Sequence, residues 1–253
     1  MSEPIQASLT DVDVEFQIYD TPQRSLKNNL IAAATGGTLA RDSRDRIVVK
    51  ALDNVSMTLE HGDRIALIGH NGAGKTTLLR VLAGIYEPTR GDVSLSGSVA
   101  AVFNVGLGID LEATGRENIY LRSLFLGIGR KDAQSLSDEI LDFAELGNFA
   151  DMPVRTYSTG MLARLQFAIT TAVQPDILLI DEGIGAGDAA FFAKAQQRMD
   201  ELMARSGILV LASHSEGLVR SMCNKAMLLN HGKVVFQGDI DDTYSAYADL
   251  IAL

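Results

Sequence analysis

A glycine-rich run, GHNGAGKTT (69–77), follows the apolar run RIALI (64–68) and opens a helical pattern at 75–84. Its spacing fits G-x-x-x-x-G-K-[ST], which predicts a phosphate-binding loop when a strand precedes it and a helix follows. Glycines let backbone N–H groups point into a small concavity, and the helix N-terminus adds partial positive charge that favours a di- or triphosphate. A merely flexible glycine turn would not explain why lysine and threonine follow at once.

This loop supplies the candidate ligands of a nucleotide and its metal. We expect Lys75 to reach the β- and γ-phosphates of ATP, and the hydroxyl of Thr76 to bind Mg²⁺. The sequence therefore predicts ATP and Mg²⁺ as cofactors. The candidate ATP-binding residues of the loop are Gly69, His70, Asn71, Gly72, Ala73, Gly74, Lys75, Thr76 and Thr77.

A second motif is acidic and lies at the end of the apolar run ILLID (177–181). Ligands of open α/β folds bind at the carboxyl ends of the strands, where this run delivers Asp181 and Glu182. We expect Asp181 to hold Mg²⁺ through water, and Glu182 to orient or deprotonate the attacking water. Taken alone, the two carboxylates could simply cap a neighbouring element, but their pairing with the phosphate loop favours catalysis.

Strand-like apolar runs alternate with longer helical patterns along the chain. This alternation predicts an α/β core with a largely parallel sheet. Between about 110 and 160 the patterns are helical without a strong strand, which indicates a helical subdomain inserted into that core. The predicted strands are 14–19, 54–59, 64–69, 177–181, 207–213, 225–230 and 233–238, the last two joined by a His231-Gly232 turn, and the predicted helices are 75–84, 160–173 and 189–206.

Composition narrows the class of protein. The 253 residues correspond to about one to two domains, and the net charge of −10 disfavours a broad nucleic-acid-binding face. No apolar run approaches the length of a membrane span, and the N-terminus lacks the features of a signal peptide, so we expect neither. The single cysteine, Cys223, excludes an internal disulfide and fits a reducing compartment. Its apolar neighbours predict a buried core thiol rather than a nucleophile.

Residues 20–46 form a basic insertion in an otherwise acidic chain. Between 21 and 46 there are five basic and two acidic residues. Leu26, Leu30 and Ala34 share a helical spacing. The segment is either a mobile surface insertion or a short amphipathic helix that lies against a membrane or a membrane partner.

The motif YSTGM (157–161) opens another amphipathic helix. Ser158 and Thr159 can cap this helix, and Gly160 allows a close backbone approach. The motif is therefore either a plain capped helix or a second phosphate-binding surface at a helix N-terminus. If it lies on the separate helical arm, one subunit cannot easily grip one ATP with both loops. A symmetric homodimer, in which each subunit closes on the other's nucleotide, removes that difficulty.

Together these motifs resemble the ATP-binding subunit of an ABC transporter over about residues 10–250. YSTGM stands where the family has LSGGQ, with Thr159 and Met161 replacing its second Gly and final Gln, and Arg164 falls at its trailing Arg. The resemblance implies an α/β P-loop NTPase core with a mostly parallel sheet, an antiparallel β subdomain and an inserted helical subdomain. The whole chain, 1–253, would form a single nucleotide-binding domain.

The resemblance also implies roles for four further residues. Asp188, in GAGD (185–188), is similar to the acidic residue of the loop that crosses the dimer interface. His214 resembles the switch histidine that senses the γ-phosphate, although a lone histidine after a strand is more often structural. Tyr19 would be the aromatic residue that stacks on adenine, and Asn104 is the nearest equivalent of the glutamine that links Mg²⁺ to the permease contact.

TGRENIYL (114–121), YSTGM and GAGD resemble exporters of O-antigen, capsular polysaccharide and teichoic acid. This resemblance implies an ATPase that powers export of a lipid-linked polysaccharide, works as a homodimer with a separate permease at the cytoplasmic face of the inner membrane, and binds no nucleic acid. A small-solute or drug transporter is one alternative. A soluble ABC ATPase acting on ribosomes or DNA is another, disfavoured by the single cassette, the acidic charge and the lack of sustained heptads.

Overall fold

The computed structural model of the chain forms two compact units, each with its own buried core. It describes residues 4–17, 38–41, 47–102, 108–125, 128, 130–181 and 189–252. The first unit comprises residues 1–99, 176–182 and 207–253, and the second comprises residues 100–175 and 183–206. The second unit therefore contains the helix that follows residue 188 as well as those between about 110 and 160.

The first unit is built on a sheet whose central strands are parallel, as the alternating pattern predicts. The strand order is β10-β9-β4-β8-β7-β6, and β4 pairs in parallel with both β8 and β9. The central strands are short, and β8 is buried along its whole length, as expected where both faces are covered. The bounds are β4 (Arg64–Ile68), β6 (Val99–Ala101), β7 (Ile177–Asp181), β8 (Ile208–Ala212), β9 (Lys225–Asn230) and β10 (Lys233–Gly238).

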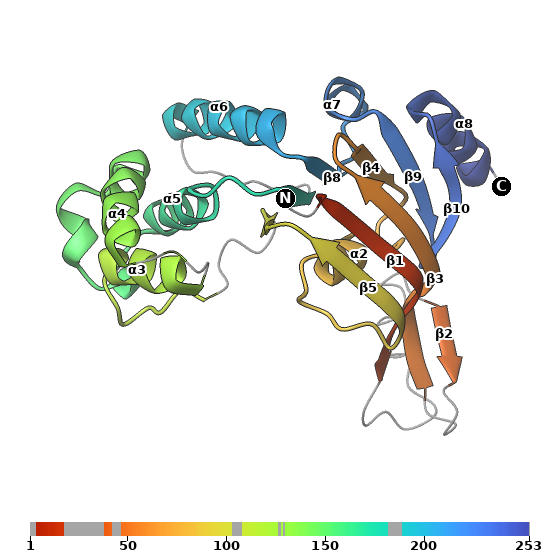
Figure 1. Ribbon diagram of the computed structural model, residues 1–253, viewed down its shortest axis with the longest axis horizontal. Coiled ribbons are helices and arrows are strands. Elements are labelled where there is room, and N and C mark those ends of the chain that lie inside the picture. Colours follow the sequence, from red (N-terminus) through yellow and green to blue (C-terminus); the bar gives the residue numbers. More distant parts are fainter. Residues whose placement is uncertain are drawn as a thin grey trace. The chain divides into compact units, whose positions relative to one another are not determined.

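A second sheet in the same unit is antiparallel, with the order β2-β3-β1-β5. Its strands are β1 (Gln6–Gln17), β2 (Thr38–Arg41), β3 (Ile47–Glu60) and β5 (Arg90–Ser96). The long arrows of β1, β3 and β5 lie side by side in Figure 1. The antiparallel β subdomain implied by the family resemblance is thereby confirmed.

These strands are longer than the sequence predicts because turn-forming residues lie inside them. β1 and β3 shift register near Asp11 and Asn54, which have positive φ values of 51° and 56°. Such residues tolerate the left-handed conformation of a bulge, so pairing resumes beyond them. Part of the basic insertion also joins the sheet, because β2 pairs with β3. The helix considered around Leu26–Ala34 lies outside the described residues.

Among its described residues, the first unit contains three α-helices: α2 (Lys75–Leu82), α7 (Glu216–Met222) and α8 (Ile240–Ile251). The helix predicted after the phosphate loop is α2, and its first residue is Lys75. α7 and α8 were not predicted. The Ser215 side chain caps α7 by accepting from the Leu218 amide, and Thr243 is fully buried on α8.

The second unit is helical, and it contains α3 (Gly115–Phe125), α4 (Arg130–Ala144), α5 (Thr159–Thr170) and α6 (Ala189–Arg205). Ile119, Ile140 and Leu165, from three of these helices, are almost completely buried in one apolar cluster. Phe143, Phe167 and α6's Phe191 form a second, aromatic contact with ring centroids 5.6–6.1 Å apart. The predicted helical subdomain thus has an interior of its own.

Cations surround the aromatic contact and converge on one carboxylate. Arg164 lies over Phe191 at 5.0 Å, and Lys194 lies over Phe143 at 4.8 Å. Glu145 accepts hydrogen bonds from Lys194 at 3.0 Å and from Arg164 at 3.4 Å. Its φ of 56° is left-handed, which is unusual for a glutamate. The end of α4 is therefore joined through Glu145 to α5 and α6.

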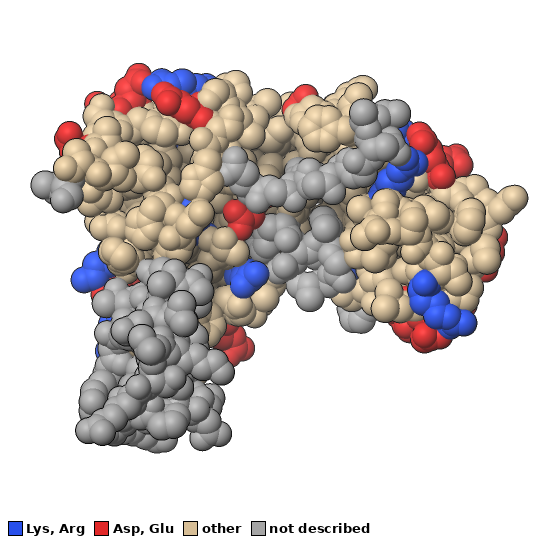
Figure 2. Space-filling view, turned by 180° about the vertical axis from the view of Figure 1, so that it is seen from behind, with Lys and Arg blue, Asp and Glu red and all other residues tan. Residues whose placement is uncertain are grey.

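The surface carries both signs of charge. Figure 2 shows charged side chains in small mixed groups on the face that it draws. Exposed ion pairs such as Arg116–Asp138, at 2.9 Å, contribute little to stability individually. Within the described residues, no helix has the length and apolar character that crossing a membrane requires.

Cys223, the only thiol in the chain, is half-buried rather than fully buried as predicted, and its reactivity provides a test of this fold. Burial raises the pKa of its thiol to about 12, whereas an unfolded thiol has a pKa of about 8.5. We expect iodoacetamide at pH 8 to alkylate the folded chain more slowly than the unfolded chain in urea, by on the order of a thousandfold, because the thiolate is the nucleophile. Equal rates, measured by mass spectrometry, would contradict the placement of Cys223.

Candidate nucleotide-binding site

The predicted phosphate loop links the end of β4 to the start of α2. Gly69, Gly72 and Gly74 have φ values of 150°, 82° and 111°, in the region that side chains disfavour. The Ala73 amide donates to the carbonyl of His70 at 3.1 Å, which closes the loop into a turn. The chain then enters α2 at Lys75, so the loop and the first turn of the helix line the same cavity.

Gly69 is required by close packing as well as by its φ. A Cβ atom at this position would lie 2.3 Å from the carbonyl oxygen of Leu229 on β9. The following turn also holds the loop, because the amide of Gly232 donates to the carbonyl of Ala73 at 2.9 Å. The β9–β10 turn therefore buttresses the phosphate loop, a contact that sequence reasoning missed.

The His70 side chain belongs to the same contact. Its Nε2 lies 3.0 Å from Oδ1 of Asn230, and its Nδ1 lies 2.8 Å from the carbonyl oxygen of Asn71. Its ring centroid is 4.9 Å from that of His231. These contacts hold the His70 side chain against the β9–β10 turn. The His70 backbone, rather than its side chain, therefore forms part of the phosphate loop.

Lys75 is almost buried, and its ammonium group is held by the loop itself. Nζ donates to the carbonyl oxygens of Gly69 at 2.6 Å and of His70 at 3.1 Å. A nearly buried ammonium needs such acceptors, because burial without them is costly. The positive charge is thereby concentrated at the concavity where the backbone amides converge.

The predicted metal ligands meet across the sheet. Oγ1 of Thr76 donates to Oδ2 of Asp181 at 2.6 Å, although 105 residues separate them. Asp181 ends β7, so the strand delivers its carboxylate to the carboxyl edge of the sheet. A hydroxyl and a carboxylate are oxygen ligands of the kind that Mg²⁺ prefers, with phosphates and water completing its shell. The two residues therefore fit a magnesium ion.

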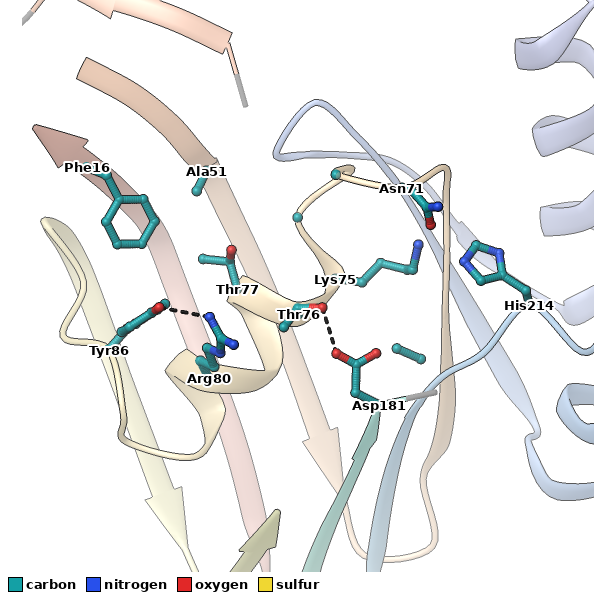
Figure 3. A pocket seen from close by; sticks show the side chains of 13 residues that line it. Phe16, Ala51, Asn71, Lys75, Thr76, Thr77, Arg80, Tyr86, Asp181 and His214 are labelled. Atoms are coloured by element: carbon teal, nitrogen blue, oxygen red, sulfur yellow. Dashed lines mark hydrogen bonds between the residues drawn. The ribbon is translucent and has the colours of Figure 1, made fainter. Parts of the chain in front are cut away.

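These groups open into one cavity of about 680 Å³. His214, which follows β8 after the buried Ser213, is exposed at its wall. Figure 3 shows Lys75, Thr76, Asp181 and His214 gathered toward one end. The structure thus brings together four of the residues predicted from separate motifs. The lining residues are Phe16, Ala51, Asn71, Gly72, Gly74, Lys75, Thr76, Thr77, Arg80, Tyr86, Asp181, Ala212 and His214.

The other end of the cavity is aromatic and was not predicted. Phe16, near the end of β1, is 40% exposed, and its ring meets that of Tyr86 edge to face, with centroids 5.3 Å apart. Nη1 of Arg80 donates to the Tyr86 hydroxyl at 2.9 Å. In Figure 3 these three side chains lie beyond Thr77 from Lys75. The sequence signal that could have found Phe16 is that it is an aromatic residue within the predicted strand 14–19.

The YSTGM motif lies in the second unit, where it starts α5. Oγ of Ser158 accepts from the Met161 amide at 3.2 Å, so the predicted cap is confirmed. Ser158 and Thr159 are exposed, and a Cβ atom on Gly160 would meet only Ser158 Oγ, at 4.0 Å. The N-terminus of this helix is thus an open surface that a ligand can approach.

Four predicted site residues lie outside the described residues: Tyr19, Asn104, Glu182 and Asp188. Glu182 directly follows Asp181 in the chain, and Tyr19 lies three residues after Phe16. Their assigned roles remain predictions.

A phosphate loop between a parallel strand and a helix, with a carboxylate beside its threonine, defines a P-loop nucleotide-binding protein. The sequence profile of the ABC transporter family matches residues 52–185, which span both motifs. The chain therefore belongs to the ABC transporter family, among its ATP-hydrolysing subunits, as its motifs predict.

Several curated relatives are export proteins. The O-antigen export system ATP-binding protein RfbE of Yersinia enterocolitica is 46% identical over 231 residues, which cover 91% of this chain and 96% of the relative. The teichoic acids export ATP-binding protein TagH of Bacillus cereus is 35% identical over 94% of this chain and 41% of its own length. The likeness to the polysaccharide export branch is confirmed by these relatives.

Solved structures show the same fold. A dimeric post-hydrolysis state of the ATP-binding cassette MJ0796, bound to ADP and Pi, matches with a TM-score of 0.65 at 20% identity. The match covers 92% of this chain and 98% of that one. The α/β ABC ATPase fold is therefore confirmed independently of the sequence motifs.

The packing of Gly69 leads to a prediction with a matched control. Gly69→Ala should weaken ATP binding more than about tenfold, because its Cβ and the Leu229 carbonyl cannot both keep their places and the loop must shift. Gly84→Ala also adds a methyl group at positive φ, 68°, but in open space. We expect it to cost about 1 kcal/mol of stability with ATP affinity retained. Titration calorimetry compares the two, and equal ATP affinities would contradict the role of Gly69.

Proposed function

We propose that this chain is the ATP-hydrolysing subunit that powers export of a lipid-linked polysaccharide, such as O-antigen or capsule, through a separate membrane permease. It would act at the cytoplasmic face of the inner membrane. The observation that carries the catalytic half is the cavity in which Lys75, Thr76, Asp181 and His214 converge. The transport half is supported by the 46% identity to an O-antigen export protein along nearly the whole chain.

The cavity, of about 680 Å³, offers ATP a phosphate-binding end and an aromatic end. Its phosphates would take the concavity lined by loop amides and by Lys75, where positive charge is concentrated. Its adenine would stack on the exposed ring of Phe16, which lines the cavity. The sequence had assigned this role to Tyr19. An aromatic ring can stack on any base, so Phe16 would not discriminate strongly among nucleotides. Most of the selectivity for a triphosphate would therefore come from the phosphate end.

Hydrolysis would proceed by attack of water on the γ-phosphoryl group. Thr76 and Asp181 would hold Mg²⁺, which would neutralise charge on the phosphates. Glu182 would orient the attacking water or accept its proton, and His214 would contact the γ-phosphate from the cavity wall. Lys75 would hold the phosphates in place, because phosphoryl transfer depends mostly on positioning and electrostatic stabilisation.

A second subunit would complete each site. The exposed N-terminus of α5 offers Ser158, the Thr159 and Gly160 backbone and Met161 to a partner's nucleotide. A two-fold homodimer would use this surface twice, and the family resemblance assigns Asp188 to the loop that crosses the dimer interface. ATP would stabilise the closed dimer and hydrolysis would loosen it, so the binding energy of ATP could drive movement of the permease.

The transport role is tested in a strain whose own copy of this chain has been deleted. We expect loss of surface polysaccharide, restored by the wild-type chain but not by Lys75→Ala or Glu182→Gln.

In purified form, Lys75→Ala should weaken ATP binding, because it removes the cation at the phosphates. Glu182→Gln should keep ATP, accumulate a dimer and lower turnover at least about a hundredfold, because it removes the general base. Unchanged surface polysaccharide in the deletion strain would refute the substrate class, and wild-type turnover by Glu182→Gln would refute its role.

The shared site is tested by mixing two inactive variants, Lys75→Ala and Ser158→Arg. In a mixed dimer, one site would combine the intact phosphate loop of one chain with the intact Ser158 of the other. We therefore expect ATPase activity to return on mixing, to a quarter or less of the wild-type rate. Each variant alone, at the same total concentration, is the control. If mixing restores nothing although mixed dimers are detected by differential tagging, Ser158 does not act across subunits.

A further inference from the structure

Beyond the phosphate end, the cavity contains two residues with no assigned role, Arg80 and Tyr86, beside the ring of Phe16 that Tyr86 contacts. All three line the cavity. Phe16 is 40% exposed, and aromatic pairs favour the edge-to-face arrangement that its ring makes with Tyr86, at an interplanar angle of 72°. Tyr86 is therefore an aromatic neighbour that restricts how the exposed ring can turn.

Tyr86 is in turn fixed to α2 by three contacts with one residue. Its amide donates to the Arg80 carbonyl at 3.2 Å, and its hydroxyl accepts from Nη1 of Arg80 at 2.9 Å. The guanidinium carbon also lies 5.4 Å from the centre of the Tyr86 ring. The orientation of this ring is thus set by the last turn of α2.

The Arg80 side chain is partly buried. Its Nε is buried and has no hydrogen-bond partner among the described residues. An unsatisfied buried donor costs more than a typical hydrogen bond contributes on balance. The guanidinium is therefore bonded to Tyr86 through Nη1 and buried at Nε.

α2 connects this cluster rigidly to the phosphate end. Lys75 is the first residue of the helix and Arg80 lies in its last turn. Five residues of α-helix span about 7.5 Å, and this distance stays fixed as long as the helix keeps its geometry. The helix that positions the phosphates therefore also sets the place of the ring at the nucleoside end.

We propose that Tyr86 and Arg80 are positioning residues for the nucleoside end of the ATP site, which act through Phe16 by holding its ring ready for the base. The proposal rests on the proposed function, since it assumes that ATP occupies this cavity. It differs from a purely structural role, in which the Arg80–Tyr86 contact would only fix the turn after α2.

Two ligands separate the roles: ATP and inorganic tripolyphosphate, which has the phosphates but no base. Tyr86→Phe keeps the ring and loses the hydroxyl, and Arg80→Lys keeps the charge and loses the planar fork. We expect each variant to weaken ATP binding roughly 3- to 10-fold, the range for one lost hydrogen bond, with tripolyphosphate affinity changed less than about twofold. KM for ATP should rise while kcat is kept, the pattern of lost ground-state binding.

A similar arginine–tyrosine contact elsewhere provides the controls. Arg220 of α7 lies over the ring of Tyr244 of α8 at 5.7 Å, and neither residue lines the cavity. Arg220→Lys and Tyr244→Phe should leave the affinities for both ligands unchanged. Titration calorimetry on the full chain measures all of these values.

A double-mutant cycle tests the route through Phe16. In a Phe16→Ala background, Tyr86→Phe should cause no further loss of ATP affinity, because the ring that it positions is gone. Additive losses would overturn the proposal, as would unchanged ATP affinity in Tyr86→Phe and Arg80→Lys or an equal loss of ATP and tripolyphosphate. If the wild-type chain bound tripolyphosphate but not ATP, or neither ligand, the proposed function itself would fail.

Discussion

The site depends on how closely the phosphate loop packs against the turn between β9 and β10. A side chain at Gly69 would overlap the carbonyl of Leu229, and the loop is bonded to the turn through Ala73 and Gly232. This contact fixes a backbone that glycine alone would leave free to move. The direction of the loop amides, the start of α2 and the position of the Lys75 ammonium all follow from it.

The parts of the site that could be predicted from sequence are those fixed by local structure. The phosphate loop follows β4 and Asp181 ends β7, and parallel strands bring their carboxyl ends to one edge, whereas His214 was predicted from the family resemblance. The Thr76–Asp181 hydrogen bond could therefore be anticipated although many residues separate the two. The same logic predicted the parallel sheet, since buried strands between helical patterns have few other arrangements.

The parts that could not be predicted depend on tertiary contacts between ordinary-looking residues. Tyr19 stays a prediction for the residue that stacks on adenine, because it lies outside the described residues. Phe16, in the same predicted strand, could not be placed in the cavity without the structure. Tyr86 follows a helix in a region without any motif, so no sequence pattern predicts its contact with Arg80. Asp11 and Asn54 similarly look like strand ends, whereas the strands continue through them.

The buttress also has a consequence for how the protein is made. His70 and the Asn230 side chain that holds it are 160 positions apart, and the turn ends close to the C-terminal helix. Synthesis delivers the N-terminal part first. A nascent chain can therefore display the whole glycine-rich motif long before that motif acquires its working shape. The phosphate loop therefore reaches the shape seen here only after the chain has been synthesised through the β9–β10 turn and has folded against it.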